Sequence, residues 1–393
     1  MDKIIYVDNA ATTELDSEIF EKMLPYMTQN YGNPSSIHKM GRIAKEAVEN
    51  ARIKVAKAIN CQPSEIYFTG GGSEADTWAI FGLAQARKSK GKHIITLAIE
   101  HHAVLHSVEA LAKIGFEVTY LKVDNKGLID IEELKKAIRQ DTILITIIYA
   151  NNEIGTIQPI EQIGKIAKEK GIIFHTDAVQ AIGNIEVDVK KQNIDMLSLA
   201  AHKFYGPKGV GALYIKKGIA IQNLIYGGGQ EKKKRAGTEN VASIVGLGFA
   251  IEKAVSNLEK NSIFVKELRD KLINGVLSAI PFTRLNGDLE KRLPGNANFS
   301  LEYIEGEAIL LMLDLKGICA SSGSACTSGS LDPSHVLLAI GLSHDVAHGS
   351  LRITLGHNNT IQEIDYILNE LPLIAHKLRK MSPLWEKVEN KGE

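Results

Sequence analysis

Short apolar segments alternate with longer amphipathic stretches through the first part of the chain, and this alternation limits the possible folds. Seven segments have the apolar composition of buried strands, and helical stretches lie between most of them. Buried strands that alternate with helices predict an α/β protein with a mostly parallel, seven-stranded sheet covered on both faces. The predicted strands are residues 65–69, 93–99, 117–123, 143–150, 172–178, 196–201 and 211–216.

The last third of the chain has a different pattern. Residues 250–280 are predicted to form one long helix, or two helices that are joined. Beyond them, strands and helices mix in an α+β pattern, which indicates a smaller C-terminal domain. We expect a large domain over residues 15–258, and a small domain over residues 1–14 and 259–393.

The composition narrows the class of function. Lys+Arg and Asp+Glu both total 46, so the formal net charge is zero, and we expect neither nucleic acid nor a membrane as a partner. The first residues lack the pattern of a signal peptide, and no apolar run is long enough to span a membrane. Three cysteines do not make a disulfide framework, and no Cys/His cluster has zinc spacing. We therefore expect a cytoplasmic protein without a metal site.

Polar residues follow several predicted strands, at the edge where parallel sheets bind ligands. The stretch "GGGSEADTWAI" (70–80) predicts a phosphate cradle, because glycines permit close backbone approach and a helix N-terminus offers free N–H groups. A tight turn with Ser73 as the helix cap is an equally good interpretation. His101 and His102 follow the second strand, and we expect only one of them to face a ligand.

The next strand ends carry an amide, a carboxylate and a lysine. Asn152 lies in a turn or fixes a polar ligand group. Asp177 ends an apolar strand, where a carboxylate needs a cationic partner such as a protonated ring nitrogen, unless it caps a helix. Gln180 is placed to address the same ligand, and Lys203 has the partly apolar surroundings that make an amine nucleophilic. Together with the cradle and the histidines, these residues predict a pyridoxal phosphate site.

Several motifs resemble those of the cysteine desulfurases of the NifS/IscS type, which are class V, fold-type I pyridoxal phosphate enzymes. The resemblance runs in one order along nearly the whole chain. The stretches "SGSACTS" (322–328) and "RAGTEN" (235–240) single out the desulfurase branch. The other motifs are "ANNEIGTIQPI" (150–160), "HTDAVQAIG" (175–183) and "SLAAHKFYGPKG" (198–209).

The resemblance implies a homodimer that converts L-cysteine to L-alanine. The sulfur would pass to Cys326 as a persulfide, and then to an acceptor or iron–sulfur scaffold protein. Lys203 would bind the cofactor covalently and remove the α-proton of the substrate, and His101 would stack on the ring and move protons. The other implied contacts are Asp177 with the ring nitrogen, Gln180 with the ring hydroxyl, Asn152 with cofactor and substrate, Gly72, Ser73 and His202 with the phosphate, Thr238 with the phosphate across the dimer interface, and Arg352 with the substrate carboxylate.

Some features depart from the family or leave alternatives open. Ala200 stands where related sequences commonly have a phosphate-binding serine, so one hydroxyl contact is lost. Arg352 is alternatively an ordinary strand-end ion pair, Cys61 is expected to be structural, and Cys319 is expected to be buried. Two other functions compete: a related class V enzyme, such as a transaminase or selenocysteine lyase, and a non-catalytic scaffold on the same fold.

Overall fold

The computed structural model describes residues 4–322, 333–383 and 385, and a seven-stranded sheet forms its centre. The strand order is β2-β8-β7-β6-β5-β3-β4. The pairs from β4 to β7 are parallel, and β8 is antiparallel to both of its neighbours, so the predicted mostly parallel sheet is confirmed. The strands are β2 (Ile66–Thr69), β3 (His93–Leu97), β4 (Glu117–Leu121), β5 (Thr142–Thr146), β6 (Ile173–Asp177), β7 (Met196–Ala200) and β8 (Gly211–Ile215).

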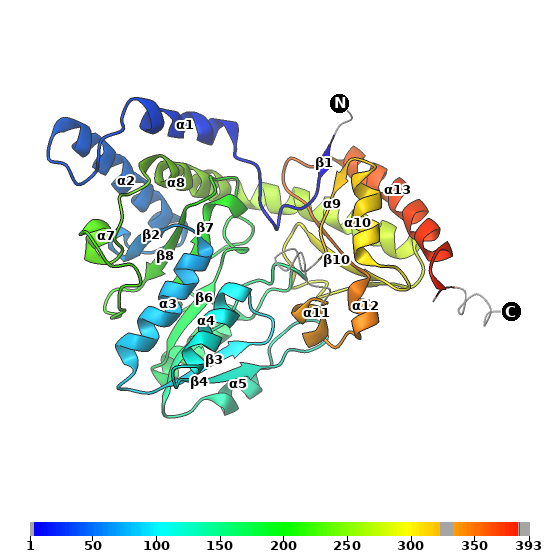
Figure 1. The fold of residues 1–393 in the computed structure, drawn as a ribbon, viewed down its shortest axis with the longest axis horizontal. Helices are drawn as coiled ribbons and strands as arrows, with labels where there is room; N and C mark the ends of the chain where they lie inside the picture. The colour runs from blue at the N-terminus through cyan, green and yellow to red at the C-terminus, as the bar shows by residue number, and fades with distance from the viewer. Residues whose placement is uncertain (1–3, 323–332, 384, 386–393) are drawn as a thin grey trace.

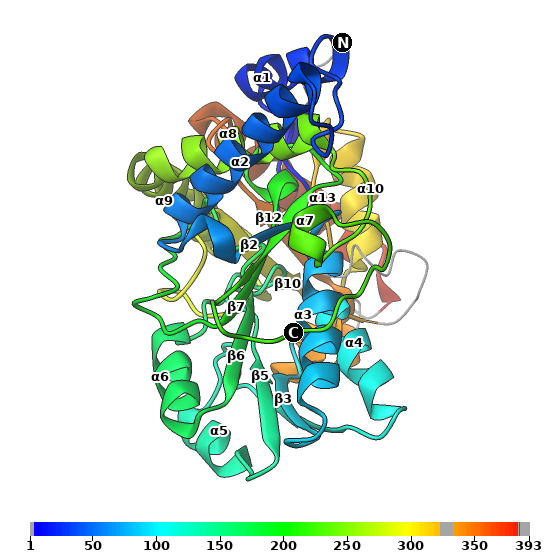
Figure 2. The same ribbon diagram turned by 90° about the vertical axis from the view of Figure 1, so that its left-hand side faces the viewer.

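Helices cover both faces of this sheet, as Figure 2 shows with α6 on one side of the strands and α3 and α4 on the other. Every residue of β3, β5, β6, β7 and β8 is buried, which explains why their sequences are apolar on both faces. The helices of this part are α1 (Ser17–Thr28), α2 (Lys39–Ala58), α3 (Gly72–Arg87), α4 (His102–Ala112), α5 (Ile131–Ala137), α6 (Ile160–Lys170), α7 (Gln230–Lys233) and α8 (Val241–Ser256), with short 3-10 turns η1 (Pro63–Glu65) and η2 (Ala201–Lys203).

The C-terminal part has a hydrophobic core of its own, and the start of the chain packs into it. Strand β1 pairs in parallel with β11, and Ile5 and Val7 lie in the same buried cluster as residues of α9 and α13 (Figure 1). The antiparallel sheet here has the order β12-β10-β9. The elements are β1 (Ile5–Tyr6), α9 (Leu258–Ala279), β9 (Thr283–Leu285), β10 (Asn296–Leu301), α10 (Gly306–Asp314), β11 (Ile318–Cys319), α11 (His335–Ala339), α12 (His344–His348), β12 (Ser350–Thr354) and α13 (Ile361–Lys380).

The long helical stretch before this core is two helices, α8 and α9, which meet at an angle of 71°. No single helix among the described residues is long and apolar enough to cross a membrane, although this bent pair passes the same test of length and composition. The domain limits expected at residues 14–15 and 258–259 stay a prediction.

A buried ion pair holds a strained segment against the sheet. Glu231, Lys232 and Lys233 all have positive φ angles (44°, 58° and 65°), a conformation that disfavours residues with a Cβ. The Glu231 carboxylate accepts two hydrogen bonds of 2.8 Å from the Arg52 guanidinium and one of 2.9 Å from the Phe68 N–H. Both charged side chains are 2% exposed, so the pair compensates two charges that water does not reach.

We predict that Glu231→Gln lowers the free energy of unfolding by about 3 kcal/mol, because the buried Arg52 charge then keeps only Glu49, a carboxylate that is 47% exposed, as its partner. The measurement is urea unfolding of both proteins. Glu132→Gln, which removes an exposed partner of Lys135, is the matched control and leaves stability unchanged. A loss no larger than that of the control would contradict the prediction.

Candidate active site

A cavity of about 380 Å³ lies at the carboxyl ends of the parallel strands. Residues that follow β3, β5, β6 and β7 meet there, although they are far apart in the chain. Thr238 is exposed and does not line this cavity, so its role across a dimer interface stays a prediction. Cys326 lies outside the described residues. The predicted site residues that line the cavity are Gly72, Ser73, His101, Asn152, Asp177, Gln180, His202, Lys203 and Arg352.

The N-terminus of α3 forms one wall of the cavity. The helix begins at Gly72 after Gly71, and no side chain caps it, so the interpretation of Ser73 as a helix cap is wrong. A Cβ atom on Gly72 would lie 2.8 Å from Cγ2 of Val179, so only glycine lets the helix come this close to the loop after β6. The free N–H groups of this 16-residue helix and its positive dipole end suit an anion. Ala200 lines the same wall and offers no hydroxyl.

Asp177 ends β6 and places a buried carboxylate in the cavity. Its Oδ1 accepts a 2.9 Å hydrogen bond from the Val179 N–H. Burial raises the pKa of Asp177 to about 6, although the Val179 hydrogen bond and the charge of Lys203 oppose that rise. A cationic ligand group beside this carboxylate would therefore be stabilised.

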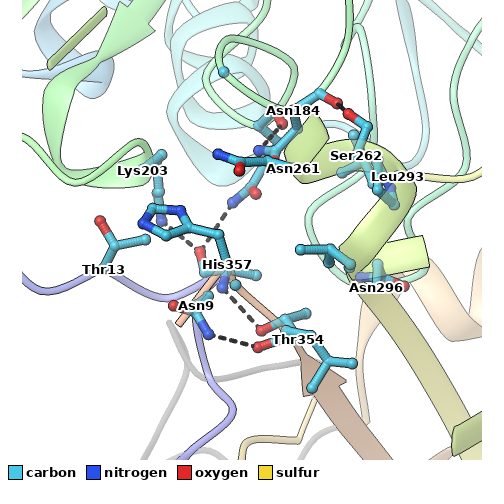
Figure 3. Close-up of a pocket in the computed structure, with 18 of the residues that line it drawn as sticks. Asn9, Thr13, Asn184, Lys203, Asn261, Ser262, Leu293, Asn296, Thr354 and His357 are labelled. Carbon is cyan, nitrogen blue, oxygen red and sulfur yellow. Dashed lines mark hydrogen bonds between the residues drawn. The ribbon is translucent and has the colours of Figure 1, made fainter. Parts of the chain in front are cut away.

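Lys203 is held by the N-terminal segment of the chain. Its Nζ donates hydrogen bonds of 2.6 and 2.7 Å to the carbonyl oxygens of Ala10 and Ala11. The side-chain amide of Gln180 donates to the Ala10 carbonyl as well, at 2.9 Å. Lys203 also lines a second, smaller cavity of about 60 Å³, where it lies close to Thr13 and His357 (Figure 3). The amine thus lies between two cavities, and two carbonyl groups near the start of the chain accept its hydrogen bonds.

The two histidines after β3 both line the large cavity, and the expectation that only one of them faces a ligand stays a prediction. His101 is the N-cap of α4, and its Nδ1 accepts a 3.1 Å hydrogen bond from the Ala103 N–H. Burial, and then the charge of Lys203, lower the pKa of His101 to about 4. His202 is neutral at pH 7 for the same two reasons, with a pKa of about 4. Neutral imidazoles can each accept one hydrogen bond and donate another.

Arg352 enters the cavity from the other core, on β12. Its Nη2 forms a 2.9 Å ion pair with Asp8 Oδ1, and its Nη1 donates to the Asn152 carbonyl at 3.2 Å. The ion-pair interpretation therefore describes this ligand-free site. The side chain is nonetheless 2% exposed, and its Nε has no hydrogen-bond partner among the described residues. A buried N–H without an acceptor suits a ligand that brings one.

The motif around Asn151 and Asn152 is interpreted either as a turn or as a site for a polar ligand group, and the two asparagines have different positions. The Asn151 side chain accepts hydrogen bonds from the Glu153 and Ile154 N–H groups, which builds the turn. Asn152 lines the cavity and contacts Arg352 through its carbonyl.

Comparisons with known proteins agree with this geometry. The family described as aminotransferase class-V matches residues 5–367. A protein of Clostridium botulinum named "Cysteine desulfurase IscS" is 58% identical over 396 aligned positions, which cover all of both chains. A solved structure described as a NifS-like protein has a TM-score of 0.91, with 40% identity over 96% of this chain and all of its own. Another, described as SspA in complex with cysteine, has a TM-score of 0.80, with 40% identity over 91% of this chain and all of its own.

The chain belongs to the class-V aminotransferase family. The family resemblance expected from the motifs is therefore confirmed along almost the whole chain. The two cysteines among the described residues lie outside the cavity of this family member. Burial raises the pKa of the Cys61 thiol to about 12, in line with a structural role. Cys319 ends β11 and is half-buried, so the expectation that it is buried is wrong.

Three buried acids of this class-V protein line the cavity and were missed in the sequence. Asp76 and Glu100 are each 1% exposed and have one oxygen without a hydrogen-bond partner among the described residues. Glu153 is 5% exposed and accepts a hydrogen bond from Ser334. The available signals were local: Asp76 lies four residues after Gly72 on one helix face, and Glu100 directly precedes His101.

Glu153 gives the ligand-free protein a pH-dependent stability. Burial raises the pKa of Glu153 to about 7, against hydrogen bonding from Ser334 and the charge of Arg352. Because the folded protein holds this proton more tightly than the unfolded chain does, its contribution to stability is complete below pH 4.5 and is lost as pH rises through 7. We predict that Glu153→Gln, which cannot ionise, becomes more stable relative to the wild type between pH 5 and 8, by roughly 2–3 kcal/mol.

Urea unfolding of the purified protein without added ligand, at pH 5, 6, 7 and 8, measures this difference. Glu169→Gln, an exposed position on α6, controls for the loss of one acidic residue. A constant difference between Glu153→Gln and the wild type across this range is the outcome that contradicts the prediction.

Proposed function

We propose that the protein is a pyridoxal phosphate-dependent cysteine desulfurase. The observation that carries this proposal is the meeting of Lys203, Asp177 and the N-terminus of α3 in one cavity. A lysine, a buried carboxylate and an anion-binding helix end are the three groups that this cofactor requires. The name of the Clostridium botulinum relative, at 58% identity over the full chain, supports the same activity.

The residues in the cavity fit the cofactor in its chemistry. Gly72, Ser73 and His202 would hold the phosphate, since the helix end presents N–H groups and excludes a Cβ at its first residue. Asp177 would pair with the protonated ring nitrogen, which supplies the cation that this buried carboxylate lacks. Gln180 would donate to the ring hydroxyl. The Ala200 position leaves one hydroxyl fewer for the phosphate.

Bound pyridoxal phosphate supplies an electron sink for the bonds around the α-carbon of an amino acid. Lys203 would bind the cofactor and then carry the α-proton, and its amine donates hydrogen bonds to the Ala10 and Ala11 carbonyls. His101 would stack on the ring and pass protons, and its neutral state at pH 7 lets one nitrogen accept a proton. Asn152 would orient both cofactor and substrate.

Arg352 would bind the carboxylate of L-cysteine. The guanidinium lies in the cavity wall with a buried, unpartnered Nε, and a substrate carboxylate would satisfy this donor. Asp8 pairs with the same guanidinium at 2.9 Å, so a substrate carboxylate would compete with it. Substrate binding therefore exchanges one carboxylate partner for another.

Cys326 would receive the sulfur. Its thiolate attacks the sulfur of the substrate, so that an S–S bond forms while the C–S bond of the substrate breaks. The electron pair of the C–S bond stays with the carbon skeleton, which takes up a proton at that carbon and leaves as L-alanine, and Cys326 carries the sulfur as a persulfide. Cys326 belongs to a stretch of small residues, "SSGSACTSGS" (321–330), a composition that suits a group that must reach both the substrate and an acceptor.

The partners of the protein follow from this chemistry. A persulfide needs a thiol-bearing acceptor, and an iron–sulfur scaffold protein is such an acceptor. The homodimer, with Thr238 of one subunit at the phosphate of the other, and the cytoplasmic location stay predictions from the sequence.

We predict that the purified protein with pyridoxal phosphate and a reductant releases alanine from L-cysteine, and that Cys326→Ala does not. The reason is that the substrate sulfur then has no thiolate to accept it. Alanine is quantified by chromatography. Alanine from both proteins would instead favour a lyase on a related substrate, and alanine from neither would remove the proposed activity. Cys61→Ala is the matched control, and it retains the wild-type rate.

We further predict that Arg352→Lys lowers kcat/KM for L-cysteine by roughly 10- to 100-fold, mainly through KM, because a lysine cannot form the paired hydrogen bonds of a guanidinium. Arg284→Lys, an exposed position on β9, serves as the control. An unchanged KM in Arg352→Lys would show that another residue binds the carboxylate.

A further inference from the structure

Asp76 is a buried acid behind Asp177, and none of the roles above uses it. It lies in the second turn of α3, is 1% exposed, and lines the same cavity as Asp177. One ligand atom each from Asp76, Asp177 and His101 all lie within 4.8 Å of one another. Two buried carboxyl groups therefore approach each other in the wall of the cavity.

No cation compensates Asp76 among the described residues. His175 would be a counter-ion only if its ring were protonated, and its Nε2 lies 3.7 Å from Asp76 Oδ1. Burial lowers the pKa of His175 to about 3, so this ring is neutral. Its two nitrogens already contact Thr146 at 2.8 Å and Ser198 at 3.0 Å. His175 is thus a neutral neighbour and not a counter-ion.

The two carboxyl groups differ in what stabilises a negative charge. Asp177 accepts the Val179 N–H and feels the charge of Lys203, and both favour its ionised form. Burial, and then the charge of Asp177, raise the pKa of Asp76 well above its ordinary value, although a hydrogen bond from Ser198 opposes that rise. The groups that face Asp76 are Asp177 and His175 from β6, Ser198 from β7, Glu100 from the end of the β3–α4 connection, and His101 from α4.

Asp76 Oδ1 has no hydrogen-bond partner among the described residues. An ionised carboxylate in that position would leave a charged oxygen buried without a donor, which costs more than a neutral acid does. Two buried carboxyl groups at this separation also resist carrying two charges.

We infer that Asp76 remains protonated behind Asp177, so that the pair carries a single negative charge and Asp177 presents that charge to the cavity. Asp76 is on this account a positioning residue. It packs against Asp177 without competing for the cation that Asp177 is placed to bind. The inference rests on the proposed function only for the identity of that cation, the ring nitrogen of the cofactor.

Replacement by the neutral isostere Asp76→Asn tests the protonation state directly. A proton that the folded protein holds and the unfolded chain releases makes the wild type less stable as pH rises above about 4, and asparagine lacks this effect. We expect the unfolding equilibrium constant of the wild type, relative to that of Asp76→Asn, to rise about tenfold per pH unit from pH 5 to 7. Asp345→Asn, exposed on α12, is the matched control and follows the wild type. An Asp76→Asn curve parallel to the wild type overturns the inference.

Titration with pyridoxal phosphate gives the second readout, through the visible absorbance of the bound cofactor. If Asp76 is neutral, Asp76→Asn binds within about twofold of the wild type, and the pH midpoint of its absorbance is unchanged. An ionised Asp76 would instead make the variant bind roughly tenfold or more differently and shift that midpoint, which overturns the inference. If the wild type binds no pyridoxal phosphate, the proposed function fails, and the stability measurement still decides the state of Asp76.

A spectroscopic measurement covers the case in which Asp76→Asn does not fold. In a Glu100→Gln, Glu153→Gln background at pH 7, a protonated Asp76 gives an infrared carbonyl band that neither of these two glutamates can contribute. The band is expected to be present. Its absence at pH 7 overturns the inference.

Discussion

The hydrogen bonds of residues 7–13 hold the active-site cavity together. Thr354 of β12 donates to the Val7 carbonyl at 2.7 Å, and its hydroxyl accepts from the Ala10 N–H at 2.9 Å. The same short segment accepts both hydrogen bonds of Lys203 through Ala10 and Ala11. It therefore joins the C-terminal core, which carries Arg352, to the large sheet, which carries Lys203. This segment helps to set the distance between the amine and the guanidinium, together with the hydrogen bond from Arg352 to the Asn152 carbonyl.

The charged groups that line the cavity suit a ligand that carries both positive and negative charges. Four acids line it, and burial raises the pKa of each one. Its histidines are neutral, and its lysine and arginine are held by carbonyls and by Asp8. A ligand with a cationic ring nitrogen and anionic phosphate and carboxylate groups would give each kind of charged group in the cavity a partner of opposite charge. The ring nitrogen would pair with an acid, and the anionic groups would pair with the helix end and the arginine. Burying these acids costs free energy when they ionise. The stability of the protein therefore depends on pH.

The sequence pattern predicted the sheet and most of the cavity, and it failed where contacts are distant in the chain. Apolar strands and the residues just after them are local signals, so β3 to β7 and Asp177 were found. The ion pair between Arg352 and Asp8 joins residues 344 positions apart, and nothing local indicates it. Asp76 and Glu153 are ordinary acids in polar stretches, and only the fold shows that they are buried. Cys326 was identified by its motif alone.

The position of the first strand has a consequence for synthesis of the protein. Ile5 pairs with Ile318, and Val7 bonds to β12 near residue 354. This segment is made long before its partners, so it finds its place on β12 only after residue 354 has been made. Until then Arg352 is missing from the cavity, so a nascent chain with a complete large sheet still has an open, unfinished site. Contacts of such high sequence separation form late, because closing a long loop precedes any gain from them.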